Sequence, residues 1–96
     1  EMRCDVTNRD QVLAACEGMD AIINCSVIRY TDHDFGVNAI GCWHIAQAAA
    51  AHRIRRVVQT GPQVTALDSL VGYHADYDVP GDAPSRPGRN LYGHTK

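Results

Sequence analysis

Two short apolar runs, separated by one long helical segment, constrain the fold of this chain more than any other feature. Residues 21–25 and 57–60 have the length of β-strands, and neither run alternates apolar and polar side chains. Such runs are typical of parallel strands that are covered on both faces. Residues 35–52 lie between them and carry apolar side chains at helical spacing. Two parallel strands joined by a helix form a right-handed unit, so the sequence predicts an α/β fold.

The N-terminal part predicts a further strand and a further helix. Residues 1–4 have the character of the tail of a strand, and residues 11–17 have that of a helix. Thr7 is the expected N-cap, and Gly18 is the expected left-handed residue after the helix. The complete pattern is strand, helix, strand, helix, strand. Because so few strands cannot close a sheet, we expect residues 1–96 to be the middle part of one domain that continues at both ends.

The segment over residues 35–52 carries two apolar stripes and is expected to be buried on two sides. The stripes are Val37, Ile40, Gly41, Ile45 and Ala48 on one side and Phe35, Ala39, Trp43, Ala46 and Ala50 on the other. Asn38 is unfavourable inside a helix, which indicates a buried hydrogen bond, with an exposed polar residue as the alternative. Gly41 costs ~1 kcal/mol relative to alanine at such a position, so it indicates close packing.

The C-terminal third differs in composition from the rest of the chain. Residues 61–90 hold all four prolines and predict a long irregular loop, either a binding segment or a disordered stretch. Residues 91–96 predict the start of a helix, on which Tyr92 and Lys96 share one face. A neighbouring ammonium favours the phenolate, which makes a tyrosine a usable acid or base near neutral pH. The same spacing also fits an ordinary helix start with an exposed lysine.

Charge and composition argue against several classes of function. The formal net charge is −2, so no surface for nucleic acid or for an anionic membrane is expected. No apolar run approaches the ~20 residues that span a bilayer. The five histidines lack ligand spacing and the four cysteines contain no C-x-x-C pair, so no metal site is expected. We expect buried thiols in a reducing compartment, which predicts a cytoplasmic protein.

Five segments taken together resemble a known family. They are Asp5-Val6, residues 20–26, residues 38–42, residues 56–60 and the pair Tyr92 and Lys96. In this order and at these separations they resemble the middle of an extended short-chain dehydrogenase/reductase, of the NAD-dependent epimerase/dehydratase family. The resemblance covers nearly the whole chain. It implies part of a Rossmann-type doubly wound parallel sheet.

The resemblance also implies a cofactor, NAD or NADP, and a small-molecule substrate with a polar hydroxyl or carbonyl group, such as a nucleotide sugar. The cofactor-binding residues that it implies are Asp5, Val6, Cys25, Ser26, Val27, Arg29, Asn38, Tyr92 and Lys96. Its implied catalytic residues are Tyr92, Lys96 and Thr60. Tyr92 would exchange a proton with the substrate, while Lys96 would lower the tyrosine pKa and bind ribose hydroxyls. The helix over residues 35–52 is the implied homodimer interface, with packing inside the monomer as the alternative.

Two departures from the family pattern bear on the function. The glycine-rich phosphate turn is absent, as expected if the protein begins before Glu1. Pro62 occupies the position of the family's catalytic serine and has no side-chain donor. Thr60, Gln63 and Thr65 are the candidate replacements. The alternative function is therefore a non-catalytic NAD(P)-binding sensor or scaffold of the same fold.

Overall fold

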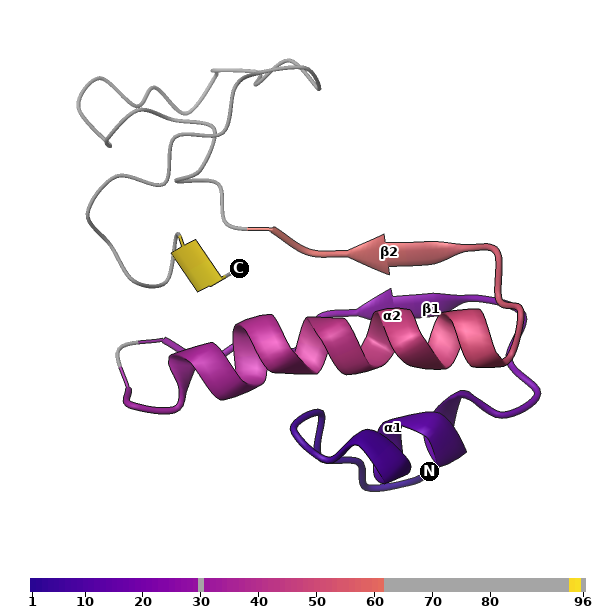
Figure 1. The fold of residues 1–96 in the computed structure, drawn as a ribbon, viewed down its shortest axis with the longest axis horizontal. Helices are drawn as coiled ribbons and strands as arrows, with labels where there is room; N and C mark the ends of the chain where they lie inside the picture. The colour runs from indigo at the N-terminus through magenta and orange to yellow at the C-terminus, as the bar shows by residue number, and fades with distance from the viewer. Residues whose placement is uncertain (30, 62–93, 96) are drawn as a thin grey trace, which may run out of the picture.

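The computed structural model describes residues 1–29, 31–61 and 94–95 (Figure 1). The element order is α1 (Arg9–Cys16), β1 (Ile22–Asn24), the π-helix η1 (Phe35–Ile40), α2 (Gly41–Ala51) and β2 (Val57–Gln59). Most of the predicted loop over residues 61–90, together with Tyr92 and Lys96, lies outside the described residues. Within the described part, no helix is long and apolar enough to cross a membrane.

The two strands form a parallel pair, as the apolar runs predict. Ile22 pairs with Val57 and Asn24 pairs with Gln59, so the two strands end side by side. The helix η1–α2 connects them, and in Figure 1 it runs alongside β1. The predicted strand over residues 1–4 is wrong, because none of these residues pairs with another strand in the described part of the chain.

The N-cap of helix α1 lies one residue later than predicted. Asn8 is the N-cap, and its Oδ1 accepts hydrogen bonds from the backbone N–H groups of Asp10 and Gln11, both at 3.1 Å. Thr7 cannot serve as the cap because its own N–H and hydroxyl donate backwards to the Asp5 carboxylate. Gly18 has a φ of 73°, which confirms the predicted left-handed residue after this helix.

The turn before η1, which the sequence prediction left as loop, is held by side-chain hydrogen bonds between Thr31, His33 and Asp34. The Thr31 hydroxyl accepts from the His33 N–H at 3.2 Å, and the Thr31 N–H donates to the Asp34 carboxylate at 3.0 Å. These bonds satisfy the backbone donors of Thr31 and His33 ahead of the helix. It also explains why the Asp34 side chain is only 2% exposed.

The core lies between the two helices. Its buried apolar members are Val12, Cys16, Ile45, Ala48, Ala49 and Ile54. Of one predicted stripe of the long helix, Gly41, Ile45 and Ala48 are confirmed as buried, whereas Ile40 is 37% exposed. Trp43 on the other stripe is 61% exposed. The prediction of strands covered on both faces also fails here, since Ile23 is 72% exposed. Burial on a second side requires a partner layer, and no described residue supplies one for these two surfaces.

Candidate functional site

The carboxyl ends of β1 and β2 form a polar cluster. Ligands of parallel α/β sheets bind beyond this edge, because loops and helix N-termini converge there. Asn24 closes β1 and lies opposite Gln59, the last residue of β2. The cluster continues into Ser26 on the following loop and Thr60 on the other strand. Among the described residues, the candidate site residues that follow the two strands, Ser26 and Thr60, thus lie at the same edge of the sheet.

Asn24 is the centre of this cluster. Its Nδ2 donates to the Gln59 Oε1 at 2.6 Å, and its Oδ1 accepts from the Ser26 N–H at 3.0 Å and from the Ser26 hydroxyl at 2.6 Å. The Asn24 carbonyl oxygen accepts from the Thr60 hydroxyl at 3.2 Å. Thr60, the implied replacement for the catalytic serine, therefore directs its hydroxyl to the neighbouring strand.

Asn38 holds the loop that follows β1. The Asn38 Oδ1 accepts from the Ile28 N–H at 3.1 Å, and its Nδ2 donates to the Ile28 carbonyl oxygen at 2.8 Å. The Nδ2 also donates to the Thr95 hydroxyl oxygen at 3.4 Å. With 0% exposure, Asn38 confirms the buried hydrogen-bonding role that its unfavourable position in a helix predicts. It thus connects the loop to the residue next to Lys96 in the sequence.

The loop over residues 25–29 presents most of its side chains outward. Cys25, Val27 and Arg29 are exposed, whereas Ser26 is half-buried. Because the loop is held at Ser26 and at Ile28, its backbone is fixed at the edge where a ligand of this fold binds. The implied cofactor residues of this loop are therefore brought together by the structure.

Asp5 and Val6 lie in the turn that precedes α1. The Asp5 Oδ1 accepts from the Thr7 N–H at 2.9 Å and from the Thr7 hydroxyl at 2.8 Å. These two bonds hold the pKa of the Asp5 carboxyl below its ordinary value, so the group is ionised at neutral pH. Beside it lies a hollow of about 670 Å³ lined by Arg3, Cys4, Asp5 and Gln11.

Helix α2 fixes the position of Val6. The His44 Nδ1 lies 3.0 Å from the Val6 carbonyl oxygen, and since a carbonyl oxygen only accepts, this nitrogen carries the proton. A Cβ added to Gly41 would lie 2.9 Å from the Val6 Cγ2, which confirms close packing at this glycine. The same helix therefore holds Val6 through Gly41 and His44, and it continues from η1, which carries Asn38.

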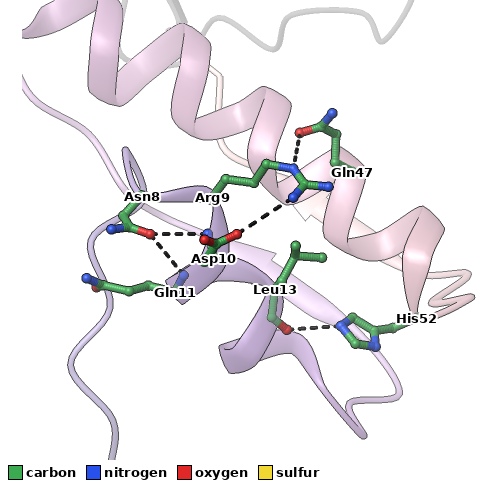
Figure 2. A network of polar contacts seen from close by, with 7 residues as sticks. All are labelled: Asn8, Arg9, Asp10, Gln11, Leu13, Gln47 and His52. Atoms are coloured by element: carbon green, nitrogen blue, oxygen red, sulfur yellow. Dashed lines mark hydrogen bonds and ion pairs between the residues drawn. The ribbon is translucent and has the colours of Figure 1, made fainter.

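Further polar contacts join α1 to α2 and are shown in Figure 2. The Arg9 Nε donates to the Gln47 Oε1 at 3.3 Å, and the guanidinium lies 3.7 Å from the Asp10 carboxylate. At the other end of the pair, the His52 Nε2 lies 3.0 Å from the Leu13 carbonyl oxygen. These contacts, together with the core, keep the turn that carries Asp5 in place beside α2.

The prediction missed Asn24 and Gln59, although each is a side-chain amide at the end of a predicted strand. That shared position is the signal that could have identified them. In the described part of the chain, no three potential metal ligands cluster. Tyr92 and Lys96 stay predictions, since they lie outside the described residues.

Two curated relatives are similar to this chain over nearly its whole length. They are uronate dehydrogenases of Pseudomonas syringae pv. tomato, at 30% identity, and of Pseudomonas putida, at 32% identity, each over 97% of this chain. The chain spans only about a third of their lengths, 33% and 34% respectively. No family model matches the chain.

Solved structures of uronate dehydrogenases are also similar to this chain, in their fold. The crystal structure of uronate dehydrogenase from Agrobacterium tumefaciens has a TM-score of 0.76 at 28% identity, over 98% of this chain and 35% of that one. A mutated uronate dehydrogenase, at 24% identity and a TM-score of 0.74 over 98% of this chain and 34% of its own, supports the fold alone. The predicted fold class, part of a Rossmann-type parallel sheet, is confirmed.

Proposed function

We propose that the full-length protein is an NAD- or NADP-dependent oxidoreductase of the extended short-chain dehydrogenase/reductase family that acts on a sugar acid. The observation that carries this proposal is the similarity to two uronate dehydrogenases over 97% of this chain. The names of these relatives make a uronate, rather than a nucleotide sugar, the first substrate to test. We propose residues 1–96 as the middle part of one cofactor-binding domain and the cytoplasm as its location.

The chemistry of the described residues fits a dinucleotide. The ionised Asp5 carboxylate borders a hollow of about 670 Å³ and is an acceptor of the kind that an adenine amino group requires. The loop over residues 25–29 follows a parallel strand at its carboxyl end, where dinucleotides bind in this fold class. Asn38 orders that loop before any ligand arrives, which reduces the entropy lost on binding.

The proposed reaction divides the chemistry between cofactor and protein. The bound nicotinamide ring accepts or supplies the hydride. Tyr92 exchanges a proton with the substrate hydroxyl, and the Lys96 ammonium favours the phenolate form. Asn38 supports this arrangement from a distance, because its amide bonds the Thr95 hydroxyl beside Lys96 in the sequence.

The first experiment is a calorimetric titration of the full-length protein with NAD⁺ and NADP⁺, followed by an assay of dinucleotide reduction with glucuronate and galacturonate. Saturable binding and turnover are expected. Tyr92→Phe should abolish turnover and leave dinucleotide affinity within about twofold, because the substitution removes only the phenolic oxygen. Equal turnover by this variant would rule out the proposed role of Tyr92. A folded protein that binds neither dinucleotide would refute the function itself.

A second candidate function is dinucleotide binding without catalysis. Pro62 in the serine position supports it, and so does the Thr60 hydroxyl, which already donates to the Asn24 carbonyl oxygen. Under this alternative the protein binds NAD⁺ or NADP⁺ but reduces neither with any uronate. The titration and the turnover assay together distinguish the two functions.

We also propose a homodimer that forms through the helix over residues 35–52. The exposed side chains of Phe35 and Trp43, on the same stripe, support this interface. Analytical ultracentrifugation of the full-length protein tests it. A monomer at all concentrations would instead favour packing of this stripe inside the monomer.

A further inference from the structure

Two side-chain amides connect the ends of the parallel strands through an ordered chain of hydrogen bonds. The Ser26 N–H donates to the Asn24 Oδ1 at 3.0 Å. The Asn24 Nδ2 donates to the Gln59 Oε1 at 2.6 Å, and the Gln59 Nε2 donates to the Thr60 carbonyl oxygen at 3.0 Å. The chain therefore runs from the loop after β1 to the residue after β2.

The donor-to-acceptor direction of this series of hydrogen bonds is fixed by the groups at its two ends. A backbone N–H, here that of Ser26, only donates, and a backbone carbonyl, here that of Thr60, only accepts. Each amide between them therefore has a single orientation that satisfies both of its neighbours. Asn24 is 5% exposed, so water does not readily replace a bond lost there.

We propose that Asn24 is a positioning residue for the dinucleotide site, acting through Ser26 on one side and through Gln59 and Thr60 on the other. This inference rests on the proposed function. Asn24 and Asn38 hold the loop over residues 25–29 at Ser26 and at Ile28 respectively. Asn24 also sets the direction in which the chain leaves β2, because its carbonyl accepts from the Thr60 N–H at 3.2 Å.

The substitution Asn24→Asp removes the hydrogen-bond donor at this position and keeps the shape of the side chain. A carboxylate has the shape of the amide, but both of its oxygens only accept. One oxygen still accepts from the Ser26 N–H, whereas the other meets the Gln59 Oε1. The Gln59 amide can rotate by half a turn to relieve this contact. Its own oxygen then lies against the Thr60 carbonyl oxygen, so one oxygen–oxygen repulsion is replaced by another.

Protonation of the introduced carboxyl restores the missing donor. Among the described residues, the groups that hydrogen-bond at position 24 are those of Ser26, Gln59 and Thr60, together with the Cys42 thiol of α2, whose Sγ lies 3.8 Å from the Asn24 Nδ2. The thiol is the titratable group among them. Burial and the facing Gln59 Oε1 favour the protonated form of a carboxyl at this position, whereas the Ser26 N–H and hydroxyl favour the carboxylate as the Thr7 donors do at Asp5, so protonation requires an acidic solution. The defect is therefore expected to reverse as the pH falls, which a simple loss of packing would not do.

The test is calorimetric titration of the full-length protein with NAD⁺, from about pH 8 to about pH 5. Asn24→Asp should bind about tenfold more weakly than the wild type at the upper pH and approach it at the lower pH. Asn8→Asp is the matched control, because its carboxylate still accepts from the N–H groups of Asp10 and Gln11 and suits a helix N-terminus. This control should match the wild type throughout.

A second variant and a second measurement keep the proposal testable if the Asn24→Asp protein does not fold. Gln59→Glu changes an exposed residue, keeps the acceptor for Asn24 and loses the donor to Thr60. It should bind the dinucleotide more weakly over the whole titration, because an exposed glutamate titrates at about 4.3 and stays ionised. Hydrogen–deuterium exchange should be faster near Thr60 in both variants at the upper pH, whereas the Ser26 N–H keeps its acceptor.

The outcomes separate the two proposals. A wild type that binds no dinucleotide overturns the proposed function, and the role in cofactor positioning falls with it. A wild type that binds, with variants of equal affinity at every pH, overturns only the role of Asn24. Weak binding of Asn24→Asp that does not recover at the lower pH also overturns it, because the loss would then not depend on the missing donor.

Discussion

Gly41→Ala tests how closely α2 packs on the turn that carries the candidate adenine-binding residues. In a helix, alanine is favoured over glycine by about 1 kcal/mol, so propensity alone predicts stabilisation. The added Cβ, however, would lie 2.9 Å from the Val6 Cγ2 and 3.2 Å from the Val6 Cβ, well inside an ordinary carbon–carbon contact. Val6 cannot simply move away, since its carbonyl oxygen is bonded to His44 at 3.0 Å.

Overpacking of this kind costs about 1–3 kcal/mol, which exceeds the gain in helix propensity. We therefore expect Gly41→Ala to lower the free energy of unfolding by about 1 kcal/mol. The assay is urea denaturation of the full-length protein, followed by circular dichroism. Ala46→Gly, at an exposed position of the same helix, should lose about 1 kcal/mol through propensity alone and serves as the control.

A double-mutant cycle with Val6→Ala assigns the cost to the contact. Removing the Val6 methyl groups removes the closest overlap, so Gly41→Ala should cost less, or stabilise, when Val6 is already alanine. A coupling energy of about 1–2 kcal/mol is expected between the two positions. Stabilisation by Gly41→Ala in the wild-type background, without coupling, would refute the close packing.

Three further predictions concern the end of α2 and the cysteines. Arg53 has a φ of 58°, in a motif at the end of α2 where the Ile54 N–H donates to the Ala49 carbonyl oxygen at 2.8 Å. Because glycine adopts this conformation without strain, Arg53→Gly should stabilise the full-length protein by about 0.5–1 kcal/mol in urea denaturation. Destabilisation would contradict this. In the cofactor-free protein, iodoacetamide should modify exposed Cys25 at least about tenfold faster than buried Cys16. Burial, and then the nearby Cys4, raises the pKa of Cys16 above its ordinary 9.0. The neutral thiol therefore favours folding below pH 9.0 and less above it, and the stability difference between wild type and Cys16→Ala should shrink as the pH rises past that value.

The tertiary structure decided which surfaces and side chains are used. Both stripes of the long helix have the same apolar character, and only the packing of α1 against one of them distinguishes core from exposed surface. Thr7 and Asn8 are both residue types that are favoured as N-caps. Asn8 is the N-cap in the structure, because the Thr7 N–H and hydroxyl donate to the Asp5 carboxylate instead. Such competition between neighbours of equal propensity depends on where each side chain lies in space.

The sequence by itself determined the local features of this protein. Apolar runs and periodicity predict the two strands and the long helix, Gly18 predicts a left-handed turn, and Asn38 predicts a buried hydrogen bond, because each follows from short-range sterics or hydrogen bonding. The pairing of Asn24 with Gln59 is different in kind. These residues are 35 positions apart in the chain, and only the register of the parallel strands brings their amides to 2.6 Å.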